Sequence, residues 1–215
     1  MKHFSGNVVF GDLEFTGLNQ PVIPIEIALV KKISSLHDRG MGLVPVDEYE
    51  EFQAYSSDWK LSDCSEWVKD NVVRPIYTNL IGGPQRDSIA MKNFMKSIGK
   101  PLSEIAYGIQ HFIDPDHGAK FFEKPFLVFD VCPYDWMGIQ TIFNGASFFG
   151  IDASVIPFQY MPIDFSTILF GLGIDPDISR EKLAIEHGIS LEGHYKHSAL
   201  CDARLLAKLW EKLTP

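Results

Sequence analysis

The stretch NVVFGDLEFTGL, residues 7–18, decides how this chain folds. Its first half is an apolar, β-branched run of the kind that forms a buried strand. Asp12 and Glu14 continue that run, and a Thr-Gly pair ending at Gly17 then favours a turn. Because alternate side chains of a strand point to the same face, the two carboxylates are predicted to project together, about 6.6 Å apart along the strand.

This pair of carboxylates predicts a site for divalent cations. At an effective dielectric constant of about 20, two negative charges at that separation repel each other by roughly 2–3 kcal/mol. A hard cation removes this repulsion, and carboxylate oxygens are the ligands that Mg²⁺ and Mn²⁺ prefer. The alternative is a solvated strand end with two surface acids, since pairs at this spacing are common. The apolar run before the pair and the Thr-Gly turn after it make that alternative less favoured.

The rest of the chain alternates between strand-like and helix-like patterns, which predicts an α/β fold with helices packed on a mixed sheet. No linker or repeat divides the chain, so a single domain over residues 1–215 is expected. The predicted strands span residues 7–11, 24–32, 50–56, 125–131 and 160–166. The predicted helices span residues 62–72, 87–101, 102–113, 135–143, 179–188 and 202–213, with Asp87 as a candidate N-cap.

Composition narrows the class of protein. The chain has 215 residues, of which 46% are hydrophobic, enough to bury a full core. A net charge of −9 argues against a protein that coats nucleic acid regardless of sequence, which needs a broad basic surface. No apolar run reaches the roughly 18 residues of a membrane span, and three scattered cysteines indicate neither disulfides nor zinc. A cytoplasmic protein that does not associate with membranes is expected.

Two segments resemble motifs of one enzyme family. The run from Asp12 to Leu18 resembles motif I of the DEDD 3′–5′ exonucleases, D-x-E-x-T-G-[LI] at the end of an apolar strand. Near the other end of the chain, His197, Ala199 and Asp202 fit H-x-A-x-x-D, the third motif of the DEDDh or DnaQ-like branch. The resemblance implies a ribonuclease H-like fold, a mixed β-sheet flanked by α-helices. His194 does not fit the motif spacing and is interpreted as a loop residue.

The middle motif of the family is irregular in this chain. Family members usually carry an Asp after the fourth strand, often as H-N-x-x-F-D. Here Cys132 and Pro133 stand nearest to the expected His-Asn pair, and Asp135 follows an aromatic residue at the start of a predicted helix. Asp135 is therefore the preferred candidate, and Asp130, within the strand, is the alternative.

The resemblance implies a metal-dependent 3′–5′ exonuclease that hydrolyses phosphodiester bonds at single-stranded 3′ ends of RNA or DNA. Two divalent cations, Mg²⁺ or Mn²⁺, are implied, with His197 as the general base. The implied metal ligands are Asp12, Glu14, Asp135 and Asp202. The implied contacts to the terminal nucleotide come from the residues around motif I, namely Leu13, Phe15, Thr16 and Leu18.

Two further expectations concern the segment at about 60–100 and the activity itself. The segment is longer than in compact family members, so we interpret it as an insertion carrying extra helices that guide substrate or form a homodimer. The alternative function is a catalytically inactive nucleic-acid-binding or scaffold protein with the same fold. The irregular middle motif favours this alternative, whereas the presence of Asp12, Glu14, His197 and Asp202 argues against it.

Overall fold

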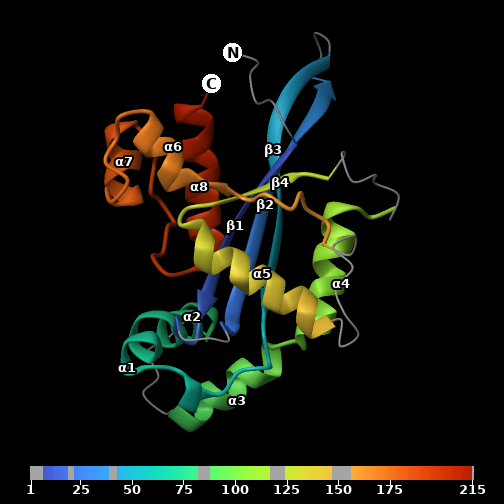
Figure 1. The fold of residues 1–215 in the computed structure, drawn as a ribbon, viewed down its shortest axis with the longest axis vertical. Helices are drawn as coiled ribbons and strands as arrows, with labels where there is room; N and C mark the ends of the chain where they lie inside the picture. Colours follow the sequence, from blue (N-terminus) through green and yellow to red (C-terminus); the bar gives the residue numbers. More distant parts are fainter. Residues whose placement is uncertain are drawn as a thin grey trace.

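The computed structural model describes residues 7–18, 22–38, 43–81, 88–116, 124–146 and 156–214, which form one mixed sheet and its flanking helices (Figure 1). The strand order is β3-β2-β1-β4-β5. β1 pairs antiparallel with β2, β2 antiparallel with β3, and β4 parallel with both β1 and β5. The strands are β1 (Val8–Phe15), β2 (Pro24–Asp38), β3 (Leu43–Tyr55), β4 (Phe126–Phe129) and β5 (Ile163–Asp164).

Alternating apolar side chains of the strands build a core on each face of the sheet. Val9 and Leu13 of β1 point into the core formed with α4 (Leu102–Ile113) and α5 (Cys132–Ala146). Phe10, between them, points into the opposite core, because successive side chains of a strand face opposite ways. That second core is closed by α6 (Phe165–Gly171), α7 (Arg180–Glu186) and α8 (Ala199–Leu213).

A helical segment leaves the end of β3 and returns to it. The Lys100 amide donates to the Tyr55 carbonyl at 2.8 Å, and the Ser57 amide donates to the Lys100 carbonyl at 2.9 Å. The segment buries its own apolar cluster against Ile25 of β2, beyond one end of the sheet (Figure 1). Its elements are η1 (Leu61–Asp63), α1 (Glu66–Val68), η2 (Lys69–Val73), α2 (Arg74–Ile81) and α3 (Ser88–Ile98).

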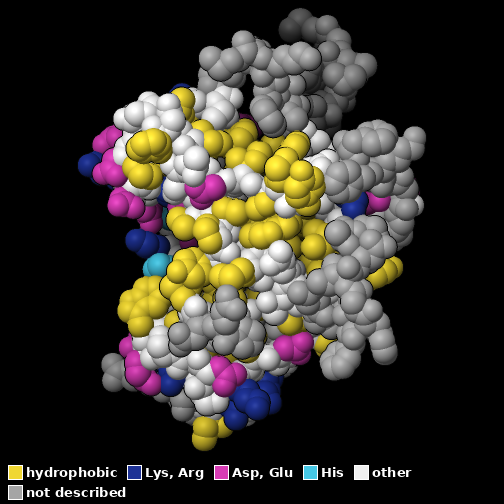
Figure 2. All heavy atoms as spheres, in the orientation of Figure 1, with side chains coloured by type: hydrophobic (Ala, Val, Ile, Leu, Met, Phe, Trp, Pro, Cys, Tyr) yellow, Lys and Arg dark blue, Asp and Glu magenta, His cyan; other side chains and the backbone are white. Residues whose placement is uncertain are grey.

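This strand order and helix placement are the ribonuclease H-like topology, so the predicted α/β fold is confirmed. The predicted N-cap Asp87 lies outside the described residues. The strand predicted over residues 160–166 is reduced to two residues, because the Asp164 side chain accepts the Thr167 amide and begins α6. Apolar side chains cover the middle of one face of the molecule, with acidic ones at its rim (Figure 2). Among the described helices, none has the length and apolar character to cross a membrane.

Candidate metal centre

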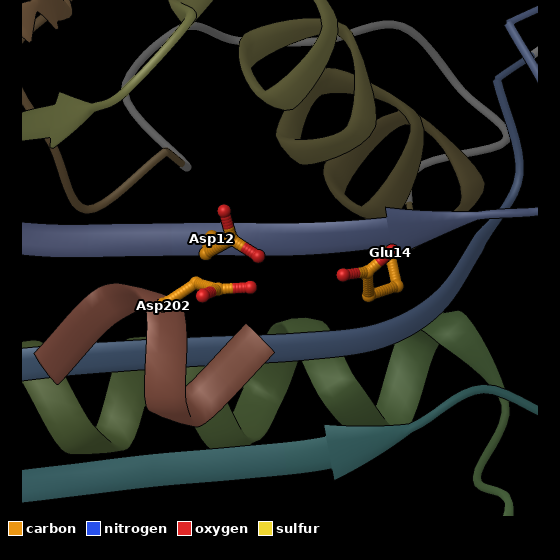
Figure 3. A group of neighbouring side chains, drawn as sticks. All are labelled: Asp12, Glu14 and Asp202. Atoms are coloured by element: carbon orange, nitrogen blue, oxygen red, sulfur yellow. The ribbon is translucent and has the colours of Figure 1, made fainter. Parts of the chain in front are cut away.

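Three carboxylates from opposite ends of the chain meet at one place. Asp12 and Glu14 lie on β1, and Asp202 lies in the first turn of α8. One oxygen of each lies within 4.8 Å of the corresponding oxygens of the other two. Figure 3 shows the three side chains directed into a shared space between β1 and α8. We call these three residues the acidic triad.

Packing between β1 and α8 brings the triad together. Ala199 and Ala203 of α8 are fully buried, and these small side chains let the helix lie close to the sheet. Farther along α8, Trp210 meets Phe10 of β1 edge to face, with ring centroids 5.8 Å apart. Phe10, Asp12 and Glu14 alternate along β1 with residues of the opposite core, so the face of β1 that packs against α8 also carries Asp12 and Glu14.

The triad concentrates negative charge with little compensation. Burial, and then the neighbouring Asp135, Glu14 and Asp202 carboxylates, raise the pKa of Asp12 well above its ordinary value. Burial and the charge of Asp202 raise the pKa of Glu14 to about 9, and burial followed by Glu181 raises that of Asp202 to about 7. Solvent still reaches these groups, since the Asp202 side chain is 27% exposed.

Asp135 lies at the side of the triad and is anchored to β1. Its Oδ1 atom accepts a hydrogen bond from the Leu13 amide at 3.0 Å. Gly138, one turn later in α5, permits this approach, because a Cβ atom there would stand 2.7 Å from side-chain atoms of both Leu13 and Phe15. Asp135 does not belong to the 4.8 Å group, yet its charge is the largest electrostatic contribution to the raised pKa of Asp12.

Asp130, the alternative candidate, is engaged in a different contact. Arg180 donates from Nε to the Asp130 carboxylate at 2.5 Å and from Nη2 to the Ser166 hydroxyl at 2.7 Å. This network joins α7 and α6 to the end of β4. Although burial raises the pKa of Asp130, the Arg180 charge opposes that shift. Asp130 also lines a cavity together with Asp12 and Asp202, whereas Asp135 is the carboxylate that acts on the pKa of Asp12. The choice between Asp135 and Asp130 as the fourth carboxylate stays a prediction.

His197 stands beside the triad in an unusual backbone conformation. Its φ is 60°, the only positive φ of a non-glycine residue in the described part of the chain. The His197 amide donates to Asp202 Oδ2 at 3.2 Å, and its Nδ1 atom lies 3.8 Å from Glu14 Oε1. Burial, followed by the charge of Lys196, lowers the pKa of His197, which favours the neutral imidazole.

Two residues near the centre were not expected from the sequence. Trp67 of α1 meets His197 edge to face, with ring centroids 5.3 Å apart, although 56% of Trp67 is exposed. His194 lies in a loop before α8, as interpreted from the sequence, and its partly buried side chain places Nε2 3.5 Å from Asp202 Oδ1. Local spacing contains no signal for either contact, because both depend on segments that return to the centre from elsewhere.

The residues expected to contact a nucleotide occupy different environments. Leu13 points into the core with α5 and is 4% exposed, and Phe15 packs against the same core. Thr16 is buried, with its amide donating to the Ile23 carbonyl at 3.1 Å. Leu18 is 59% exposed, so its side chain is available to a ligand rather than packed in the core. Contact of any of these residues with substrate stays a prediction.

A cavity of about 330 Å³ opens from the triad toward α7. Asp12, Asp202 and His197 line one side of it, and Val131, Arg180 and Lys196 contribute to the rest. A second cavity, of about 320 Å³, lies beside Glu51 and Arg204 and includes no triad residue. Of these two cavities, the first is therefore the one that opens Asp12 and Asp202 to solvent.

The chain matches no protein-family model, and a search of the curated proteins finds no match. The assignment to the ribonuclease H-like fold consequently depends on strand order and helix placement. The acidic triad is a feature of the structure itself and could hold a metal ion.

Proposed function

We propose that this protein is a metal-dependent 3′–5′ exonuclease of the DEDDh type that acts on single-stranded nucleic acid ends. The observation that carries the proposal is the acidic triad, whose three oxygens lie within 4.8 Å of one another, with the His197 ring beside it. A strand and a distant helix each contribute acids to one solvent-accessible centre. This arrangement suits the hydrolysis of a phosphodiester better than it suits a structural role.

The residues present fit divalent cations. Carboxylate oxygens are hard ligands of the type that Mg²⁺ and Mn²⁺ take. Burial and the neighbouring carboxylates raise the pKa values of Asp12 and Glu14, and a bound cation would favour their ionised forms. Asp12, Glu14 and Asp202 would hold the metal, with Asp135 completing a second position. When bound, such ions lower the pKa of a water molecule and stabilise the departing 3′ oxygen.

The neutral imidazole of His197 is suited to accept a proton from the attacking water. Glu14, 3.8 Å from its Nδ1 atom, would then stabilise the imidazolium that forms. Trp67 and Leu18 present exposed apolar side chains that a nucleobase can contact, and stacking of this kind tolerates any base. A single strand is the favoured substrate, because base pairing would hinder threading of a 3′ end among the carboxylates.

The proposal is tested with single-stranded RNA and DNA oligonucleotides labelled at the 5′ end, in Mn²⁺ or Mg²⁺ and in EDTA. We expect a ladder of products that shortens from the 3′ end, requires the metal and disappears with Asp12→Ala. Comparison of the two oligonucleotides identifies the preferred sugar. Degradation that continues in EDTA, or that survives Asp12→Ala, contradicts the proposal.

The same assay separates the enzyme from a binding protein that has kept the fold without its activity. An inactive binding protein would shift the fluorescence anisotropy of a labelled oligonucleotide but leave its length unchanged in Mn²⁺. The exonuclease would shorten it under those conditions. Asp12→Ala serves as the matched control, since it should bind the oligonucleotide without cutting it.

A further inference from the structure

Glu26 is a fully buried carboxylate on the strand next to the acidic triad. It lies on β2, where it is the antiparallel partner of Glu14 on β1, and it is 0% exposed. Side chains of directly opposed residues project from the same face of a sheet, so Glu26 points toward α8 as Glu14 does. Its charge contributes to the raised pKa values of Asp12, Glu14 and Asp202.

The contacts of Glu26 join three elements. Its Oε1 atom accepts a hydrogen bond of 2.6 Å from Nε2 of Gln53 on β3. Burial raises the pKa of Glu26, whereas the Gln53 side chain and then the nearby backbone amides of Ala199 and Leu200, at the start of α8, lower it. The Oε2 atom is buried and has no hydrogen-bond partner. No cation in the described part of the chain forms an ion pair with this carboxylate.

The start of α8 needs an acceptor from outside the helix. The first amides of a helix have no partner within it and are usually satisfied by the side chain of the N-cap residue. Ser198 occupies the N-cap position of α8 but makes no such hydrogen bond. A carboxylate at this end also interacts favourably with the helix dipole. Glu26 thus places a buried carboxylate from β2 beside the amides that Ser198 leaves uncapped.

We propose that Glu26 is a positioning residue for the metal centre, which holds the first turn of α8 so that Asp202 stays within ligand distance of Asp12 and Glu14. The inference rests on the proposed function, because it assigns Glu26 a part in metal binding. Glu26 is not itself a member of the acidic triad. It acts through the placement of Asp202, which follows Ala199 by three residues and Leu200 by two.

The hydrogen-bond pattern allows a matched pair of variants. In Glu26→Gln one acceptor oxygen is replaced by an NH₂ group, which can only donate. In either orientation of the amide this NH₂ group faces another donor, which is the Gln53 NH₂ group or the backbone amides of α8. Adding Gln53→Glu reverses the hydrogen bond between positions 26 and 53 and leaves an amide oxygen for α8. The double variant Glu26→Gln/Gln53→Glu therefore restores the contacts that the single variant breaks.

Mn²⁺ affinity is measured by calorimetry on the full chain, well below each variant's melting temperature. Because outer partners of metal ligands typically contribute about 10- to 100-fold in affinity, we expect Glu26→Gln to raise the Mn²⁺ Kd roughly tenfold. The double variant should recover most of this loss. Hydrogen exchange at the Ala199 and Leu200 amides should quicken in the single variant and return toward the wild-type rate in the double variant.

A variant in the opposite core controls for general destabilisation. Ile109→Val removes one methyl group from a fully buried side chain of α4 and should leave the Mn²⁺ Kd unchanged. Two results would overturn the positioning role, provided that Asp12→Ala still loses the metal. In the first, Glu26→Gln binds Mn²⁺ as tightly as the wild type. In the second, the double variant binds Mn²⁺ no better than the single variant. Failure of the wild-type chain to bind Mn²⁺ would instead overturn the proposed function.

Discussion

The amide of Leu13 donates a hydrogen bond of 3.0 Å to the carboxylate of Asp135, which joins the strand that carries the acidic triad to the first turn of α5. The bond is buried, so loss of the acceptor leaves the Leu13 amide unsatisfied at a cost of about 1–3 kcal/mol. Asp135→Ala should therefore reduce both stability and activity. Asp135→Asn keeps an acceptor oxygen and should reduce activity alone.

These two variants are compared by urea unfolding and by the degradation assay. We expect nuclease rates about 10- to 100-fold below the wild type in both, since each removes a charged oxygen from the centre. Only Asp135→Ala should lower the free energy of unfolding. Equal unfolding curves for the two variants would show that the hydrogen bond to Leu13 contributes little.

Gly138 controls the distance between α5 and β1. A Cβ atom at this position would stand 2.7 Å from side-chain atoms of Leu13 and Phe15, so Gly138→Ala should force these side chains apart at a cost of about 1–3 kcal/mol. Gly171→Ala is the matched control, because no atom lies within 4 Å of a Cβ at that position in α6. It should gain up to about 1 kcal/mol from helix propensity. Thermal unfolding of both variants tests the difference, and similar melting temperatures would contradict it.

His197 combines its expected role in proton transfer with a left-handed backbone. This conformation costs a side chain other than glycine roughly 1–2 kcal/mol, and strain of this kind often occurs at functional sites. We expect His197→Gly and His197→Ala to lower kcat by about 100-fold or more while Mn²⁺ binding largely remains. In urea unfolding, the Gly variant should be the more stable of the two. An Ala variant with normal turnover would remove His197 from the mechanism.

Local patterns in the sequence were sufficient where the chemistry follows a short spacing. Asp12 and Glu14 are two residues apart on one strand, and His197 and Asp202 flank the start of one helix, so each pair is set by a single element. The sheet and most helices were likewise predictable from hydrophobic periodicity. That the two pairs meet could be expected only from the family resemblance, because 188 positions separate Glu14 from Asp202.

The remaining features depend on contacts between distant elements. Asp130 and Asp135 both follow β4, and the choice between them depends on Arg180 and on the approach of α5 to β1. Glu26 stands within the apolar run of β2, where a single acid is typical of a position that faces solvent. Trp67 reaches His197 only because the segment after β3 folds back beside the centre. None of these contacts has a local pattern.

Trp67 should matter for long substrates and not for the chemical step. Stacking of a base on an aromatic ring contributes about 1–3 kcal/mol, so Trp67→Ala should raise the KM for an oligonucleotide about tenfold, and Trp67→Phe should raise it less. Hydrolysis of thymidine 5′-(p-nitrophenyl phosphate), which has a single base, should change little. Phe170→Ala is the control, because Phe170 is an exposed aromatic residue of α6. Equal losses on both substrates would assign Trp67 to the support of His197 instead.

The acidic triad should make the metal-free protein less stable as pH rises. Glu14 has its pKa raised from 4.5 to about 9, so between these values the folded chain holds a proton that the unfolded chain has released. The stability that this proton contributes is fully present below the pKa of Glu14 in the unfolded chain. It is lost as pH rises through the pKa of Glu14 in the folded chain. In EDTA the melting temperature should therefore fall between pH 7 and pH 9.

Neutral substitution isolates the contribution of Glu14 to this pH dependence. Glu14→Gln should melt at a higher temperature than the wild type at pH 8 in EDTA and should show a flatter pH profile, although its nuclease activity is lost. Glu192→Gln, which alters an exposed carboxylate, should follow the wild-type profile. Mn²⁺ at 100 times its Kd should stabilise the wild type by about 2.7 kcal/mol and stabilise Glu14→Gln less, since it has one charged ligand fewer. If the wild type and Glu14→Gln melt alike at pH 8, the charge of Glu14 is already compensated within the protein.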